Sequence, residues 1–378
     1  MLKKIVIAPD SFKGTMSSVE ICALIAAEIR KYLPEAEVVQ IPIADGGEGT
    51  VDAYLAGMGG VRRRVTVLGP MGEPVDAEYG ILPDGKTAVI EMAAASGLPL
   101  VHGKKSPLDA TTYGTGQLMA DAAAQGCTDM ILGIGGSATN DGGIGAMAAL
   151  GVRFLDENGN TVTPDGKGLG KIARIDASGL LPAVRDVRIT IACDVKNPLA
   201  GENGAANVFG PQKGATPEMV AQLDENLLHY NTVLTGFCGV DRRAEQGMGA
   251  AGGIALSLKA FLQAEITPGI ELLLDTAAFD KHLEHADLVI TGEGKIDAQS
   301  AQGKVPVGVA RRAKKQGVAV VALVGDVGEG ISALYDEGIT AVFSTNKAAV
   351  PYEIARKTSA EDLCFLTESL LRFYCAVR

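Results

Sequence analysis

Short apolar runs mark both ends of the chain, and each is followed by a polar loop and then by an amphipathic stretch. A continuous apolar run is typical of a strand that is buried on both faces of a parallel sheet. Amphipathic stretches between such runs indicate helices that cover the sheet. The strands predicted in this way cover residues 5–8, 38–44, 287–290, 318–324 and 341–343.

The stretch after the first strand carries the signals of a helix start and a helix end. Ser17 is followed three residues later by Glu20, which is the spacing of a capping box. Isoleucines then recur every four positions from Ile21 to Ile29, on one helical face, and Pro34 ends the helix. A helix between two buried strands predicts a βαβ unit and therefore a parallel sheet.

The pattern changes after Arg62. Residues 65–67, 75–79 and 88–90 read as short strands separated by glycine and proline turns, which predicts an antiparallel meander. A helix from Tyr113, a buried strand at 130–134 and a further strand at 187–193 follow along the chain.

This order of elements predicts an α/β fold with a discontinuous domain. Residues 1–64 and 285–378 would form one doubly wound, Rossmann-like domain around a parallel sheet. Residues 65–284 would form a second α/β domain inserted into it.

Composition and charge narrow the class of protein. Hydrophobic residues make up 47% of the 378 residues, which is ample for a large core. The net charge of −11 speaks against nucleic acid as a partner. The first apolar run stops at Ala8, too short for a signal peptide, and no run reaches the length of a membrane span. We therefore expect a cytoplasmic protein that does not enter a membrane.

Polar loops follow several of the predicted buried strands, and all of them contain Asp. In open parallel sheets, ligands bind beyond the carboxyl ends of the strands, so we expect these loops at active-site edges. Glycines let backbone N–H groups approach an anion, and a helix N-terminus favours negative charge, so the loop at 135–143 is the strongest phosphate-site prediction. The loops are 10–15, 45–50, 135–143, 194–198 and 292–297.

These loops contain the groups that phosphoryl transfer requires, although the Walker A and protein-kinase signatures are absent. That chemistry needs Mg²⁺ held by carboxylates, cations on the transferring group and a carboxylate that accepts the hydroxyl proton. Two other functions stay open from the residues alone: a dinucleotide-dependent oxidoreductase using the glycines at 133–138, and a sensor that binds a small acid. The residues considered are the carboxylates Asp45, Asp194, Glu293 and Asp297 and the cations Lys13, Lys213 and Lys295.

Six segments, which comprise parts of these five loops and one further turn at 210–214, resemble the motifs of the class I glycerate kinases, in order and over essentially the whole chain. The resemblance implies a flavodoxin-like domain interrupted by a second α/β domain, with the active site in the cleft. It also implies ATP-dependent phosphorylation of D-glycerate with Mg²⁺, giving 2-phosphoglycerate, with carbon 3 as the alternative position. The segments are 10–14, 44–50, 135–143, 192–198, 210–214 and 291–297.

Within that resemblance, five of the six matched segments receive a hypothetical role. Lys13 and Ser11 would bind the acceptor carboxylate or the transferring phosphate, and Asp194 would take the hydroxyl proton. Lys295 would offset charge on the triphosphate. Asp45, Gly46 and Gly47 would line the acceptor pocket, and Glu293 and Asp297 would hold Mg²⁺. The nucleotide and its phosphates would be bound by Gly135, Gly136, Ser137, Thr139, Asn140 and Asp141.

Overall fold

The computed structural model of the protein describes residues 2–103 and 105–377. The chain forms two compact units. Unit 1 comprises Met1–Asp45, Asp52–Gly59 and Ile270–Arg378, and unit 2 comprises Gly46–Val51 and Gly60–Gly269. The domain boundaries expected after residues 64 and 284 stay a prediction.

Unit 1 is built on a five-stranded sheet in which every neighbouring pair of strands is parallel. Counted along the chain, the strand order is 2-1-3-4-5, which is the flavodoxin-like order of a doubly wound fold. The predicted fold class is therefore confirmed. In spatial order the strands are β2 (Glu37–Gln40), β1 (Lys4–Ile7), β11 (Leu288–Thr291), β13 (Ala319–Val324) and β15 (Ala341–Ser344).

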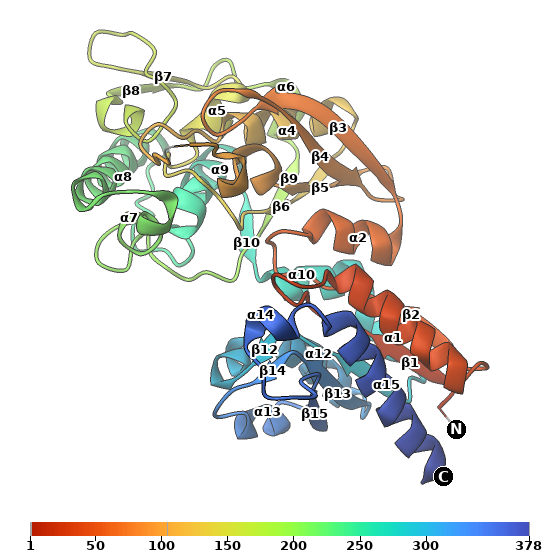
Figure 1. Ribbon diagram of the computed structural model, residues 1–378. Coiled ribbons are helices and arrows are strands. Elements are labelled where there is room, and N and C mark those ends of the chain that lie inside the picture. The colour runs from red at the N-terminus through yellow and green to blue at the C-terminus, as the bar shows by residue number, and fades with distance from the viewer. Residues whose placement is uncertain (1, 104, 378) are drawn as a thin grey trace. The chain divides into compact units, whose positions relative to one another are not determined.

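Helices cover this sheet as the amphipathic pattern predicted. Helices α1 and α15 lie side by side and share an apolar core with β1, β11 and β13 (Figure 1). Helix α12 contacts β11 and β13. The helices of this part of the chain are α1 (Ser18–Tyr32), α2 (Thr50–Met58), α10 (Gly269–Thr276), α11 (Phe279–Leu283), α12 (Val305–Lys315), α13 (Ser332–Asp336), α14 (Tyr352–Ala355), α15 (Ser359–Ala376) and the 3-10 helix η5 (Ala298–Gln302), with the small strands β12 (Lys295–Ile296) and β14 (Asp326–Val327) beside them.

Local signals in the sequence account for the first helix. The Ser17 hydroxyl accepts a hydrogen bond from the Glu20 backbone N–H at 3.2 Å, and the Glu20 carboxylate accepts one from the Ser17 N–H at 2.8 Å. The predicted capping box is confirmed. The next strand was expected at 38–44 but ends at Gln40. Pro42 has no backbone N–H and therefore cannot continue the hydrogen-bond ladder. Ile43 instead donates its N–H to the Pro9 carbonyl.

Unit 2 is built on a six-stranded mixed sheet. Its strands β10, β9, β6 and β5 run parallel, whereas β5, β4 and β3 form the predicted antiparallel meander. In spatial order the strands are β10 (Glu265–Thr267), β9 (Arg188–Ala192), β6 (Asp129–Gly133), β5 (Thr87–Glu91), β4 (Pro74–Ile81) and β3 (Val61–Leu68).

The helices of unit 2 pack around one large apolar core that includes residues of β4, β5, β6 and β9. A two-stranded sheet of β7 (Arg153–Leu155) and β8 (Arg174–Asp176) lies at its periphery. In the part of the chain that the structure describes, no helix is both long and apolar enough to cross a bilayer. The helices are α3 (Ala93–Ser96), α4 (Tyr113–Ala124), α5 (Ile144–Ala149), α6 (Pro182–Arg185), α7 (Ala205–Phe209), α8 (Pro217–Cys238) and α9 (Ile254–Leu262), with 3-10 turns η1 (Leu98–Leu100), η2 (Gly168–Lys171), η3 (Pro211–Lys213) and η4 (Ala250–Gly252).

Candidate active site

In unit 1, two of the predicted loops meet where the strand order changes direction, between β1 and β11. The Asp10 N–H donates to the Gly292 carbonyl at 2.8 Å, and the Thr291 hydroxyl donates to the Ala8 carbonyl at the same distance. These bonds hold the loop after β1 against the loop after β11. Ligands of open α/β sheets bind at such a switch point, beyond the carboxyl ends of the strands.

Four ionisable side chains gather at this switch point. The Lys13 ammonium lies 3.2 Å from a carboxylate oxygen of Asp45, and both side chains are well exposed. Burial, and then the negative charge of Asp45, raise the pKa of Asp10 to about 7. Asp45 also raises the pKa of Lys13, and Glu293 acts on both Asp10 and Lys13 in the same direction. The structure therefore brings together Lys13 and Asp45, two of the predicted site residues, and adds Asp10 to them.

The two predicted metal ligands, Glu293 and Asp297, are linked through one serine. The Ser300 hydroxyl donates to Glu293 Oε1 at 2.5 Å and accepts from the Asp297 N–H at 3.2 Å. Glu293 is buried, which raises its pKa, and the Lys304 ammonium lies 4.0 Å from its second oxygen. The Asp297 carboxylate caps η5 by accepting the Gln299 N–H.

The remaining predicted residues of unit 1 lie on the same two loops. Ser11 is half-buried, and its backbone N–H donates to the Asp10 carboxylate at 2.7 Å. Lys295 lies in the short strand β12 with an exposed side chain. Both positions are accessible to a ligand.

In unit 2, the glycines at 46 and 47 pack directly on the ends of two strands. The Gly135 N–H donates to the Gly46 carbonyl at 3.1 Å. A Cβ atom on Gly135 would lie 2.6 Å from the Gly47 Cα, and one on Gly46, at φ +86°, would lie 2.6 Å from the Ala192 carbonyl. Only glycine fits at these positions, because the backbones approach too closely for a side chain. The predicted acceptor-pocket glycines thus contact the predicted phosphate loop.

The loop after β6 contains buried polar groups around one lysine. The Lys213 ammonium donates to the Ser137 hydroxyl at 2.8 Å and to the Thr139 carbonyl at 2.6 Å. The side-chain hydroxyl of Thr139 and both amide atoms of Asn140 are buried, and no residue in the part of the chain that the structure describes is a hydrogen-bond partner for them. Burial lowers the pKa of Lys213 to about 7, an effect that the Asp141 charge opposes.

Asp141 differs from its neighbours because its carboxylate is already fully hydrogen-bonded. One oxygen accepts from the N–H and the hydroxyl of Thr112, each at 2.7 Å, and from the Gly145 N–H at 3.2 Å. The other accepts from the Gly143 N–H at 3.0 Å. The residue is completely buried, and burial raises its pKa. Its carboxylate therefore faces donors of the protein itself.

Asp194 follows β9, at the carboxyl end of the unit 2 sheet. Its side chain is exposed, and one carboxylate oxygen accepts the Gly269 N–H at 3.3 Å. This bond ties the carboxylate to the segment after β10 while most of the group stays accessible.

Comparison with known proteins shows the family of this chain. The family model described as "Glycerate kinase family" matches residues 5–375. The chain belongs to the glycerate kinase family. It is accordingly a kinase, and the oxidoreductase and binding-protein interpretations are set aside.

Individual relatives of this kinase cover almost its full length. A glycerate kinase of Halalkalibacterium halodurans is 49% identical over 91% of this chain and 90% of its own. A glycerate 2-kinase of Escherichia coli is 47% identical over 96% of this chain and 95% of its own. A crystal structure from Salmonella typhimurium LT2, provisionally assigned as glycerate kinase 2, is 43% identical, with a TM-score of 0.89 over 100% of this chain and 99% of its own.

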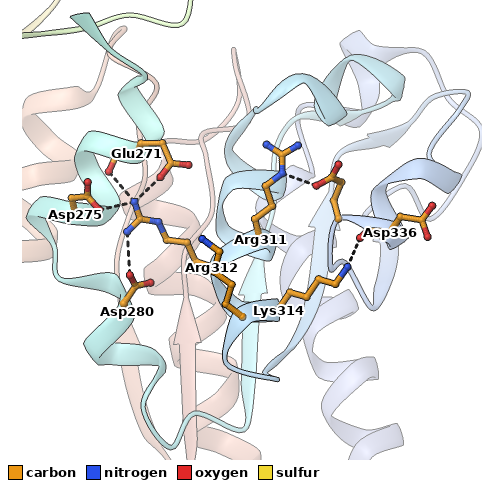
Figure 2. A pocket seen from close by; sticks show the side chains of 9 residues that line it. Glu271, Asp275, Asp280, Arg311, Arg312, Lys314 and Asp336 are labelled. Carbon is orange, nitrogen blue, oxygen red and sulfur yellow. Dashed lines mark hydrogen bonds and ion pairs between the residues drawn. The ribbon is translucent and has the colours of Figure 1, made fainter. Parts of the chain in front are cut away.

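A pocket of about 700 Å³ elsewhere in unit 1 of the kinase contains none of the predicted site residues. Figure 2 shows Arg312 of α12 reaching Glu271 and Asp275 of α10, at 2.5 and 2.6 Å, and Asp280 of α11 at 3.5 Å. Arg311 pairs with Glu337 in the same pocket. The arginines of this pocket are thus paired with carboxylates of the same pocket.

Three residues of the candidate site were not among the site residues predicted from the sequence. Asp10 and Ser300 lie within or beside segments it did select, and their polar side chains next to glycine loops were the available signal. Lys213 was considered only as one of several cations. Its burial could not be read from the sequence, because the hydroxyl and carbonyl that receive it lie in a loop more than seventy positions away.

Proposed function

We propose that this kinase transfers the γ-phosphoryl group of ATP to D-glycerate and produces 2-phosphoglycerate. The observation that carries the proposal is the cluster of Asp10, Lys13, Asp45 and Glu293 at the switch point of a flavodoxin-like sheet, where a small charged ligand is expected. The position of the product phosphate is supported by the glycerate 2-kinase of Escherichia coli among the relatives.

Lys13 is proposed to bind the carboxylate of the acceptor, or the phosphate during transfer. Its ammonium is held near Asp45 at 3.2 Å but is well exposed, so an incoming anion can share it. Ser11, on the same loop, would add a hydroxyl donor, and Asp45 with Gly46 and Gly47 would line the acceptor pocket. The hydroxyl groups of glycerate suit a carboxylate acceptor such as Asp45.

The loop of residues 135–140 is proposed to bind the phosphates of ATP. Gly135 packs against the Gly47 backbone, Gly136 turns the chain at φ +72°, and Ser137, Thr139 and Asn140 would supply side-chain donors. Asp141 was predicted to belong to this set. We propose instead that it positions the loop, because its oxygens already accept four hydrogen bonds.

Asp194 is proposed as the base. As the hydroxyl oxygen on carbon 2 bonds to the γ-phosphorus and the bond to ADP breaks, the hydroxyl proton would pass to the Asp194 carboxylate. Asp10 is a second possibility, because its pKa of about 7 suits proton transfer near neutral pH. Lys295 would offset charge on the triphosphate.

Mg²⁺ is proposed to be held by Glu293 and Asp297. Among the described residues no group of three or more His, Cys, Asp or Glu side chains is arranged to hold a metal. Mg²⁺ at kinase sites typically takes only one or two carboxylates and fills its shell with water and phosphate oxygens, so the carboxylate pair joined by Ser300 fits it. When bound, the ion would neutralise charge on the phosphates.

Phosphorus NMR of the purified protein with ATP, Mg²⁺ and D-glycerate tests the proposal. We expect a new phosphomonoester signal that requires the acceptor and whose proton coupling shows a single proton on the phosphate-bearing carbon. Coupling to two protons would place the phosphate on carbon 3. Absence of any acceptor-dependent product would refute ATP-dependent phosphorylation of glycerate, and L-glycerate in a parallel sample tests the stereochemistry.

A further inference from the structure

Lys213 is an unusually placed cation. It ends η3, and only 2% of the residue is exposed. Its two hydrogen-bond acceptors, the Ser137 hydroxyl and the Thr139 carbonyl, are both uncharged. Within the described ranges, no carboxylate lies at ion-pair distance from its ammonium, and Asp141 is the only charge that acts on it from further away.

A buried ammonium with neutral acceptors is costly for the folded protein. Transfer of a charge from water into the interior is unfavourable unless an opposite charge or a full set of hydrogen bonds compensates it. Two of the three ammonium protons are used here, and burial lowers the pKa of the group to about 7. An anion next to Lys213 would remove this cost.

The same loop contains a second, independent sign of a missing ligand. The Thr139 hydroxyl and both amide atoms of Asn140 are buried and have no hydrogen-bond partner among the described residues, and both residues are 0% exposed. Buried polar side chains in folded proteins are almost always hydrogen-bonded, and exceptions call for an explanation. An oxyanion would accept hydrogen bonds from the hydroxyl and from the amide nitrogen.

We propose that Lys213 supplies the positive charge of an oxyanion subsite that Ser137, Thr139 and Asn140 complete, and that this subsite binds an anionic group of one of the two reactants. The inference deepens the proposed function, on which it rests. Phosphate and carboxylate share the chemistry that the subsite recognises. The phosphate of the nucleotide is the source we expect, because Ser137, Thr139 and Asn140 belong to the loop that is proposed to bind the phosphates of ATP.

The competing explanation is that Lys213 only stabilises the loop after β6 through its hydrogen bonds and contacts no ligand. A purely structural lysine would affect stability and leave the affinity for each reactant unchanged once the protein is folded. The variant K213M keeps the length of the side chain and removes its charge. K259M is the matched control. Lys259 is a partly buried lysine of unit 2 whose ammonium pairs with the Glu245 carboxylate.

Titration calorimetry of the full-length variants with ADP, and separately with D-glycerate, tests the inference. We expect K213M to lose at least about tenfold in affinity for ADP, the loss typical of a charged hydrogen bond, while K259M binds as the wild type does. Loss of affinity for D-glycerate alone would assign the same subsite to the acceptor carboxylate. Unchanged affinity for both ligands would overturn the proposal.

Two further measurements keep the test decisive. If K213M does not fold, S137A removes a neutral partner of the ammonium and should weaken binding of the same ligand several-fold, and unchanged binding by S137A would then count against the subsite. Wild-type protein is assayed in parallel for acceptor-dependent product. An active wild type whose K213M variant binds both ligands normally refutes the subsite alone, whereas an inactive wild type refutes the proposed function.

Discussion

The polar clusters of the two units differ in how far their charged and polar groups are paired within the protein. In unit 1, Lys13 and Asp45 pair with each other at the surface, where water screens the charges. In unit 2, Lys213 and Asn140 are buried. Among the residues that the structure describes, the Lys213 ammonium has only uncharged acceptors and the Asn140 amide has no hydrogen-bond partner. A ligand of unit 1 must share groups that already pair with an opposite charge, whereas an anionic ligand of unit 2 would give Lys213 an opposite charge and the Asn140 amide a hydrogen-bond partner.

This difference indicates where the protein gives up stability for binding. Exposed ion pairs contribute little to folding, so the unit 1 cluster can be altered at small structural cost. Buried groups without partners destabilise the folded state, and removal of one should stabilise the protein while it weakens binding. The predictions below separate these two behaviours.

The largest effect is expected from the base. D194N should lower kcat by about 100-fold or more, because the acceptor proton would have no carboxylate to receive it. D10N, the corresponding change in unit 1, should lower kcat less. Steady-state kinetics with saturating substrates measure both, and D186N, at another exposed aspartate of unit 2, is the control. A large loss in D10N with near-normal turnover in D194N would move the role of base to unit 1.

The stability of unit 2 should depend on pH through Lys213. Its pKa is about 7 in the folded protein and about 10.5 in a free lysine, so between these values the unfolded chain binds a proton that the folded chain does not. Stability of the wild type should therefore fall as the pH decreases from about 10 to 7, by up to about 1.4 kcal/mol per unit, relative to K213M. Urea denaturation at several pH values measures this difference. Parallel curves for the two proteins would show that Lys213 is not destabilising.

Asp141 should behave as a structural residue. D141N would place an amide NH₂ among N–H donors and should cost about 2–3 kcal/mol of stability. D129N, at an aspartate paired with Arg188 on the surface, should cost less than about 1 kcal/mol. Thermal or urea denaturation compares the variants. A D141N protein of wild-type stability with impaired ADP binding would return Asp141 to the nucleotide site.

The smallest effect is expected at Thr139. T139V removes a buried hydroxyl that has no hydrogen-bond partner within residues 2–103 and 105–377. It should raise stability by about 1 kcal/mol without ligand, while binding of ADP weakens a few-fold. T112V is the matched control, because that hydroxyl is equally buried but donates to Asp141, so its loss should destabilise. Equal losses of stability in both variants would mean that Thr139 has a partner in solution.

Features that depend on local patterns were predictable from the sequence. The three central strands of unit 1, which are buried, and the capping box of Ser17 and Glu20 follow from spacing within a few residues, whereas the outer strands β2 and β15 are only partly buried. Parallel strands with helical crossovers leave few topologies to choose from. Four of the loops predicted to contain catalytic or binding residues follow β1, β6, β9 and β11.

Features that depend on distant contacts were not predictable. The approach of Gly46 to Ala192 requires knowledge of which strand ends meet. The carboxylate of Asp141 is oriented by Thr112, so its sequence neighbours gave no sign that it points into the protein. Lys213 contradicts the hydrophobic pattern itself, because a lysine is expected at the surface.

The order of strands in unit 1 has a consequence for how the chain acquires its structure during synthesis. Ile5 of β1 pairs with Leu288 of β11, and β11 occupies the middle of the sheet. The ribosome must therefore complete nearly all of unit 2 before β1 and β2 can find their central neighbour. Chains are made at about 5–20 residues per second, so the first βαβ segment waits on the order of ten seconds or longer with an unpaired strand edge. A prior collapse of the long uninterrupted segment 60–269 would shorten the span that this pairing has to close. Interaction of nascent chains with chaperones should accordingly concentrate on the first 45 residues.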